Sequence, residues 1–284
     1  MLENDRIPKL CLQIAAWGCA ALTFGVLAFM AWLSIPVLKA SNTVQILTQP
    51  WLPNQGQFGI GPMILGSLYI SVLSLIIAGP VSFGGAIFIR ITRPGIAGKI
   101  FQHLVEAMTA VPTVVYGFIG VFLIVPFIRE TFLQGSGMCI LSASIMLALV
   151  IAPTMILIFS QSISNVPREY TIAAEAMGAT PAQTFFMIIL PYAWKGILTG
   201  LILGFGRAVG DTLIALMISG NAIAFPGHIL DSARTLTAHI ALVTAADFDS
   251  MEFKTLFVCA LTLYLLTCLG VFSARVIGKR QRSS

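Results

Sequence analysis

The sequence predicts that residues 1–284 form one all-α membrane domain with six transmembrane helices and both termini in the cytoplasm. Hydrophobic residues make up 57% of the chain and charged residues only 10%, whereas soluble domains carry about 25% charged residues. Charges are also missing from long stretches, such as the one between Lys39 and Arg90. Since about 20 mostly apolar residues cross a bilayer, this distribution excludes a soluble globule.

Apolar runs and the residues that interrupt them place the first three spans. The run at about 11–38 exceeds a signal-peptide core of about 7–15 residues and has no small-residue cleavage site, so we expect it to remain in the membrane. The second span, at about 62–89, follows a polar, charge-free loop that contains proline and glycine. The third, at about 104–128, carries Glu106 near its inner end.

Two longer connections separate the remaining spans. The fourth span, at about 138–160, is followed by a connection at 161–191, which we expect inside the cell. The fifth span, at about 192–221, is followed by a connection at 222–253, which we expect outside. The last span covers about 255–274.

The distribution of basic residues sets this orientation, because cytoplasmic loops carry the excess of Lys and Arg. With both termini inside, the outer segments hold only Lys39, Arg129, Arg234 and Lys254. The inner segments hold Arg6, Lys9, Arg90, Arg93, Lys99, Arg168, Lys195, Arg275, Lys279, Arg280 and Arg282. The net charge of +5 therefore reflects membrane topology, and a nucleic-acid partner is not expected.

The sequence lacks the residue patterns that metal sites and nucleotide-binding loops require. The five cysteines lie in apolar runs without paired spacing and the three histidines are scattered, so we expect no metal site. The segment 95–99 is too short for a phosphate-binding P-loop and has no Ser or Thr after its lysine. We therefore expect neither a catalytic site nor a cofactor in this chain, and energy for any transport must come from an ion gradient or from partner chains.

The inner connection has the signals of two short helices. A helix from Pro167 would end at Gly178, which supplies a left-handed cap at little cost. Thr180–Gln183 then offers a capping hydroxyl, a proline at the first helical position and a capping-box glutamine. Ala173 and Ala174 give the first helix little bulk, which suits close approach by another backbone. An amphipathic hairpin lying on the lipid surface is the alternative.

Two charges lie inside the fifth span. Counting about 1.5 Å per residue from Lys195 places Arg207 about 18 Å deep, near the bilayer centre. An arginine there costs about 2.5–3.5 kcal/mol and should face protein or water. Asp211, four residues later, would lie on the same helix face within reach of an ion pair. An arginine fork suits a tetrahedral oxyanion; a buried pair that only fixes helix packing is the alternative.

Other polar side chains could line a pathway beside this pair. Thr113, Tyr116 and Glu106 belong to the third predicted span, and Thr212 follows Asp211. Hydrogen bonding between helices, with Glu106 reaching the membrane surface, is an equally acceptable interpretation of the third span.

The inner connection resembles the cytoplasmic loop of ABC-transporter importer permeases. The family pattern is Glu-Ala-Ala, three residues, Gly, nine residues, then Ile-x-Leu-Pro, and this chain matches it from Ala173 through Gly178 to Pro191. Ile172 replaces the glutamate, although Glu169 and Glu175 flank it on nearly the same helix face. The resemblance implies a type I ABC importer permease fold whose coupling helix, with Glu169, Ala173, Ala174, Glu175 and Gly178, docks on an ATP-binding subunit.

Further motifs resemble the phosphate permeases of this family. The segment 206–212 is similar to their Gly-Arg-Ala-x-Gly-Glu-Thr, with Asp211 in place of Glu, and 111–117 and 234–237 also look like that family. The glycine before Arg207 and the Arg-Thr-Leu-Thr of 234–237 favour the PstC type over the PstA type. Asp211 leaves the exact oxyanion open among phosphate, tungstate, molybdate and phosphonate.

This resemblance implies an inner-membrane subunit of an ATP-driven phosphate importer. Its partners would be a second permease of the PstA type, two ATP-binding subunits that hold ATP and Mg, and a periplasmic phosphate-binding protein received at 222–253. A proton- or sodium-coupled carrier that uses Asp211 and Glu106 is the rival class, and the lack of an internal repeat argues against it.

Overall fold

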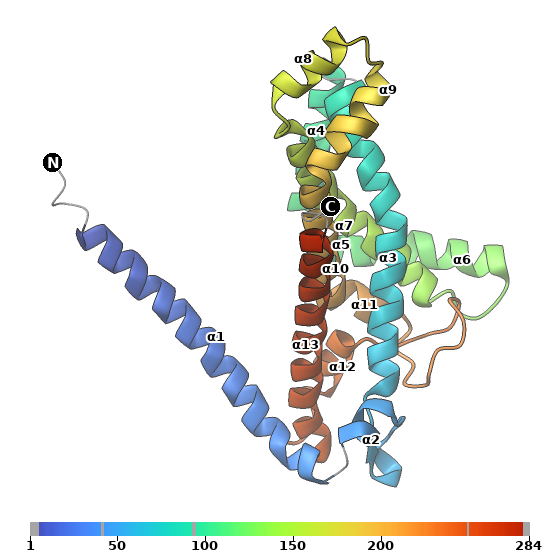
Figure 1. The fold of residues 1–284 in the computed structure, drawn as a ribbon. Coiled ribbons are helices and arrows are strands. Elements are labelled where there is room, and N and C mark those ends of the chain that lie inside the picture. Colours follow the sequence, from blue (N-terminus) through green and yellow to red (C-terminus); the bar gives the residue numbers. More distant parts are fainter. Residues whose placement is uncertain (1–5, 41–42, 93–94, 249, 281–284) are drawn as a thin grey trace.

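The computed structural model describes residues 6–40, 43–92, 95–248 and 250–280, which are mostly helical (Figure 1). The long helices are α1 (Arg6–Ala40), α3 (Gly61–Ile87), α7 (Ile140–Ser164), α10 (Leu190–Gly210) and α13 (Met251–Arg280). The shorter ones are α2 (Thr43–Thr48), α4 (Ile96–Ala110), α5 (Thr113–Ile119), α6 (Val125–Phe132), α8 (Arg168–Ala176), α9 (Pro181–Thr184), α11 (Leu213–Ile218) and α12 (Leu236–Val243). Two short strands, β1 (Trp51–Leu52) and β2 (Gln57–Phe58), pair as an antiparallel hairpin.

Six helical segments are long and apolar enough to cross a membrane. They cover Lys9–Lys39, Gly61–Ile91, Thr113–Phe132, Ile140–Ser164, Pro181–Gly210 and Met251–Ser273. The all-α fold with six transmembrane helices is therefore confirmed. The cytoplasmic placement of the termini stays a prediction, and two of the basic residues that support it, Arg93 and Arg282, lie outside the described residues.

Helix α7 is the centre of the bundle, with α3 and α10 packed against it. Its sequence is apolar on all sides, as expected of a helix surrounded by other helices, and Ile151, Met155 and Phe159 are fully buried. Gly200 and Gly204 let α10 approach closely, because a Cβ atom at either position would lie within 2.7 Å of Phe159 or Met155. Small residues at such crossings are a common packing device in membranes.

Helix α1 leaves the bundle at a steep angle (Figure 1). It meets α13 near its own C-terminal half, where the rings of Phe29 and Phe257 pack edge to face at 6.2 Å. Most of its apolar side chains, including Leu12 and Trp17, are exposed in the single chain. This surface needs cover by lipid or by another chain, because water would not stabilise it.

The third span begins later than 104–128 predicts. Helix α4 ends at Ala110, Val111 adopts an extended backbone with ψ 127°, and a new helix starts at Thr113 after Pro112. Proline has no backbone N–H to donate and disfavours helical geometry in the residue before it. Glu106 therefore belongs to α4, a separate helix, and does not share a span with Thr113 and Tyr116.

Candidate translocation site

Arg207 lies in the last turn of α10, where it is half-buried. Its Nη1 donates a hydrogen bond of 3.0 Å to the hydroxyl of Thr154 on α7. Gly206 and Gly210, its neighbours on α10, face open space, since a Cβ atom at either would meet nothing within 4 Å. Arg207 is thus held by a neutral partner, and the helix surface beside it is not covered at Gly206 and Gly210 by other parts of the described chain.

Asp211 does not pair with Arg207, and the predicted ion pair is wrong. Helix α10 ends at Gly210, and the backbone turns after Asp211 (φ −73°, ψ 126°), which brings the start of α11 within reach of its side chain. The Asp211 carboxylate instead accepts a hydrogen bond of 2.9 Å from the backbone N–H of Ile214, at the start of α11. The Arg129–Glu130 pair meets the salt-bridge geometry at 3.9 Å, whereas Arg207 and Asp211 do not.

This capping role predicts how Asp211 variants behave. Asp211→Asn keeps an acceptor at the cap, because Asn and Asp cap helices about equally well, whereas Asp211→Ala removes it at a cost of about 0.5–2 kcal/mol. We expect the Asn variant to retain uptake and thermal stability near those of the wild type, and the Ala variant to lose part of both. Melting curves and uptake assays on the purified complex measure the difference. An Asn variant as defective as the Ala variant would mean that the charge, rather than the cap, matters.

The predicted fifth span, 192–221, is interrupted in its last third, since the apolar helical segment covers Pro181–Gly210. The chain turns at Asp211 and Thr212 before α11 continues to Ile218. The hydroxyl of Thr237, just inside α12, donates a 2.9 Å hydrogen bond to the Asp211 carbonyl and satisfies a group that the broken helix leaves free. Thr212 lies in the turn itself and is half-buried. Interrupted membrane helices stay stable only where other protein or water satisfies the freed backbone groups.

A second interrupted segment packs on this one. Gly117 and Gly120 bring the α5 region against α11, where a Cβ atom would meet Met217 or Ile218 within 2.7 Å. The Tyr116 hydroxyl donates a 3.1 Å hydrogen bond to the Met108 carbonyl and so joins α4 to α5 across the break at Pro112. The breaks in the third and fifth predicted spans are therefore parts of one packed region.

The other predicted polar residues of this region have separate environments. Thr113 is half-buried in the first turn of α5. Glu106 is exposed on α4 and accepts a 2.8 Å hydrogen bond from the Gln102 side chain four residues before it. No hydrogen bond in the described residues joins Arg207 to Thr113, Tyr116 or Glu106. Thr154, which does contact Arg207, is the residue that sequence reasoning missed; its only signal was a hydroxyl in an apolar run.

The inner connection has the predicted pair of helices, α8 and α9, at one end of the bundle (Figure 1). Thr180 and Gln183 form the predicted capping box, and Gly178 adopts a left-handed backbone with φ +83°. Glu169, Ala173 and Glu175 are exposed, whereas Ala174 is buried against the chain's own structure. Two apolar side chains are also strongly exposed, with Ile172 at 59% and Met177 at 83%.

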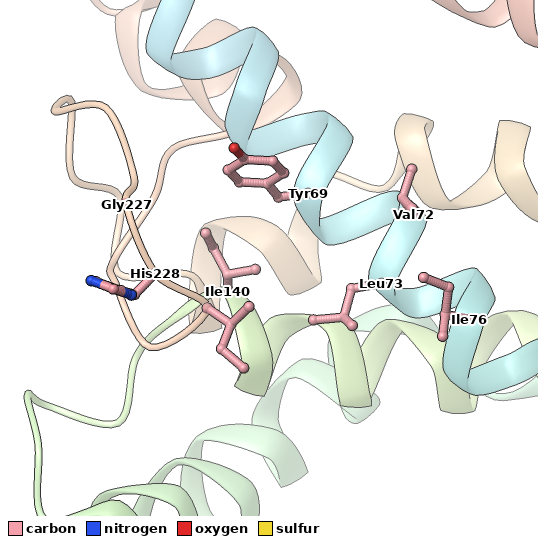
Figure 2. Close-up of a pocket in the computed structure, with 8 residues that line it drawn as sticks. Tyr69, Val72, Leu73, Ile76, Ile140, Gly227 and His228 are labelled. Atoms are coloured by element: carbon pink, nitrogen blue, oxygen red, sulfur yellow. The ribbon is translucent and has the colours of Figure 1, made fainter.

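A separate cavity of about 280 Å³ lies between α3, the start of α7 and the outer connection (Figure 2). Its walls are mostly apolar, with Val72, Leu73, Ile76 and Ile140 among the lining residues, and Ile76 is 62% exposed on the outside of α3. Arg207 and Asp211 do not line it. Because an oxyanion would be poorly solvated against such walls, this cavity is not the site for a charged substrate.

The comparisons with known proteins identify the class of membrane protein to which this chain belongs. Residues 72–283 match the family described as "Binding-protein-dependent transport system inner membrane component", and the chain belongs to this family. It is therefore a membrane permease subunit of an ABC importer, a multi-pass protein of the plasma membrane. That description names the membrane component of the system rather than its ATPase.

Individual relatives of the chain are also permease proteins of ABC transporters and phosphate transport systems. The chain is 31% identical over 275 residues to the probable ABC transporter permease protein YqgH of Bacillus subtilis, covering 95% of this chain and 88% of the relative. It is 28% identical to the phosphate transport system permease protein PstC of Pasteurella multocida, over 81% of this chain and 78% of the relative. PstC proteins of Xylella fastidiosa and Haemophilus influenzae are 26% and 27% identical.

Solved structures agree on the fold. A chain of a bacterial alginate ABC transporter, bound to its periplasmic protein with an alginate pentasaccharide, superimposes with a TM-score of 0.67 at 15% identity. The match covers 98% of this chain and 97% of that chain. A chain of the MetNI methionine ABC transporter superimposes with a TM-score of 0.57 at 19% identity, over 75% and 93% of the two chains. The predicted ABC importer permease fold is thereby confirmed.

Proposed function

We propose that the chain is a permease subunit of an ATP-driven phosphate importer and that Arg207 contacts the anion during passage. The observation that carries this proposal is a half-buried arginine bound to a neutral hydroxyl, 3.0 Å away, at the end of an interrupted helix. A guanidinium offers five fixed donors and matches two oxygens of a tetrahedral anion at once. With no carboxylate bound to it, Arg207 keeps donors for a substrate that passes.

Phosphate is favoured over other oxyanions by the relatives. Several proteins named as PstC phosphate permeases match most of this chain at 26–28% identity. The segment 206–212 also resembles the phosphate-permease motif, apart from Asp211. Tungstate, molybdate and phosphonate share the tetrahedral charge pattern, and competition between the anions distinguishes them.

The partners follow from the family and from surfaces that the chain leaves uncovered. The pathway region around α5, α6 and α11 exposes many apolar side chains, including Val114, Phe118 and Phe122, which a second permease of the PstA type would cover. Helices α8 and α9, with Ile172 and Met177 exposed, would dock on one of two ATP-binding subunits. The outer connection, 222–253, would receive a periplasmic phosphate-binding protein.

The orientation is part of the proposal. Helix α1 begins and α13 ends on the side of the molecule toward which α8 and α9 lie (Figure 1). If α8 and α9 meet a cytoplasmic ATPase, both termini are cytoplasmic, in agreement with the excess of basic residues in those segments.

Reconstitution in proteoliposomes tests the assignment. The complex of this chain with its second permease, ATP-binding subunits and phosphate-binding protein should take up radioactive phosphate only when ATP is supplied. Excess unlabelled phosphate should compete, and equal tungstate, molybdate or phosphonate should not. This chain alone should be inactive, because six spans are too few to enclose a charged pathway. Uptake by the single chain under a proton or sodium gradient would overturn the proposal in favour of a secondary carrier.

A further inference from the structure

A segment of the outer connection folds back onto the break between α10 and α11. The backbone N–H of Ala233 donates to the Ser219 carbonyl at 2.9 Å, and Thr237 reaches the Asp211 carbonyl as described above. On the other side, the Leu236 N–H donates to the Ser67 hydroxyl of α3 at 2.9 Å. These bonds fix Arg234 on α11's outer end, in the same packed region as the Arg207 helix terminus.

Arg234 has neutral partners only. Its Nε donates to the Asn221 carbonyl at 3.1 Å, and its Nη1 lies 3.5 Å from Nδ1 of His239. The side chain is half-buried, and this burial lowers the pKa of the guanidinium. Among the described residues no carboxylate reaches salt-bridge distance of it. A positive charge that is partly removed from water and left without a counter-charge is strongly stabilised by an anion.

His239 is the second neutral partner of Arg234. Its side chain is fully buried, and burial, aided by the Arg234 charge, lowers its pKa to about 4, so the ring is neutral near pH 7. Arginine can only donate, so Nδ1 must be the acceptor of their contact and Nε2 must carry the proton. That Nε2 has no hydrogen-bond partner in the described part of the chain, and neither has Oδ1 of Asn221.

We propose that Arg234 is an outer anion-binding station, at which an oxyanion binds to the guanidinium before it reaches Arg207. The inference rests on the proposed function, because it takes the chain to conduct an oxyanion. The Nη2 group and the remaining Nη1 hydrogen of Arg234 bind the anion, while the Nε bond to Asn221 holds the fork in place. The neutral His239 fixes the guanidinium without competing with the anion. Two separate arginine stations let an anion move stepwise, since each binds it only partially.

Charge rescue at this position tests the station. In the reconstituted complex, with the exposed Cys11, Cys19 and Cys268 replaced by serine, Arg234→Cys should lower phosphate uptake roughly 10-fold, the loss of one charge-assisted interaction. Treatment with aminoethyl methanethiosulfonate, which attaches a positive group, should restore much of the uptake. The neutral methyl reagent should not restore it. Inorganic phosphate should slow the labelling reaction. Lys39→Cys, which removes an exposed positive charge at the C-terminal end of α1, is the matched control and should change nothing.

The results of these experiments distinguish an anion-binding role of Arg234 from a purely structural role. If Arg234 only holds the loop through Asn221, then Arg234→Cys lowers the yield of complex, and the charged and neutral reagents act alike; that result overturns the station. Arg234→Lys, which keeps the charge but loses the fork and the Nε bond, should assemble and retain more uptake than Arg234→Cys.

The assignment of phosphate as the substrate is tested independently of the role of Arg234. If the wild-type complex transports tungstate and not phosphate, the assignment of phosphate is overturned. The experiments on the Arg234 variants are then repeated with tungstate. Phosphate uptake that depends on Arg207 but not on Arg234 overturns the station and leaves the proposed function standing.

Discussion

Arg207→Gln is expected to lower phosphate uptake at least roughly 100-fold while the complex still assembles. Two charge-assisted hydrogen bonds from one guanidinium are each worth about 1.5–3 kcal/mol, and 1.4 kcal/mol corresponds to a factor of ten. Glutamine keeps a donor that can reach Thr154, whose hydroxyl lies 3.0 Å from Nη1 of Arg207, so the packing of α10 on α7 should survive. Uptake in proteoliposomes, together with the yield of complex and its basal ATPase rate, measures the effect.

Matched variants distinguish anion contact from packing. Arg207→Lys should retain part of the uptake, because a point charge replaces the bidentate fork. Thr154→Val removes the hydroxyl that holds Arg207 and keeps the charge, so we expect only a modest loss. If Thr154→Val were as damaging as Arg207→Gln, Arg207 would serve helix packing. The double variant Arg207→Gln with Asp211→Asn should stay inactive, since the two side chains form no ion pair whose joint removal could compensate.

Gly178→Asp is expected to uncouple ATP hydrolysis from transport. Gly178 has φ +83° and is exposed, and a Cβ atom there would meet nothing within 4 Å of the chain itself. Apart from the strain of a side chain at this positive φ, a large defect would come from the docked partner, against which aspartate would place bulk and a new charge. We expect uptake to fall at least roughly 10-fold, the cost of one unfavourable charged contact, with the spans inserted normally. ATPase stimulation by the loaded binding protein and phosphate uptake are the two measurements.

Two controls separate docking from backbone strain. Gly178→Asn has nearly the shape of the aspartate variant and tolerates the left-handed conformation equally well, so the difference between the two reports the charge. Gly56→Asp places the same substitution at φ +69°, again with nothing within 4 Å, on the outer hairpin. It should share any strain and leave coupling intact. Normal uptake and normal ATPase stimulation in Gly178→Asp would refute docking at this surface.

Much of the fold could be predicted because it depends on local chemistry. Charge-free apolar runs of bilayer length identified the membrane helices, and the signals at Gly178, Thr180 and Gln183 gave the two short inner helices with their caps. Span boundaries were less certain where a helix stops inside an apolar run. Pro112 marks one such break, yet proline also occurs inside α3 and α7 without ending them, so the residue type alone does not decide.

The candidate site was predictable in part. An arginine in an apolar span is costly anywhere, so Arg207 could be singled out without a structure. Its partner could not, because Thr154 is distant in the sequence and only the packing of α10 on α7 brings it near. The link between Asp211 and Thr237, and that between Arg234 and His239, likewise depend on how the outer connection folds back.

The sequence by itself determined that this protein is an all-α membrane permease with an arginine in its fifth span, because bilayer length, hydropathy and motif spacing are properties of the chain alone. Only the tertiary structure decided that Arg207 and Asp211 form no salt bridge. Their spacing of four residues allows a salt bridge, but α10 ends at Gly210, the Asp211 carboxylate accepts from the backbone N–H of Ile214 in the next helix, and Thr237 satisfies the Asp211 carbonyl. Helix continuity in a membrane depends on whether neighbouring segments can satisfy the freed backbone groups, and those neighbours are assembled only on folding.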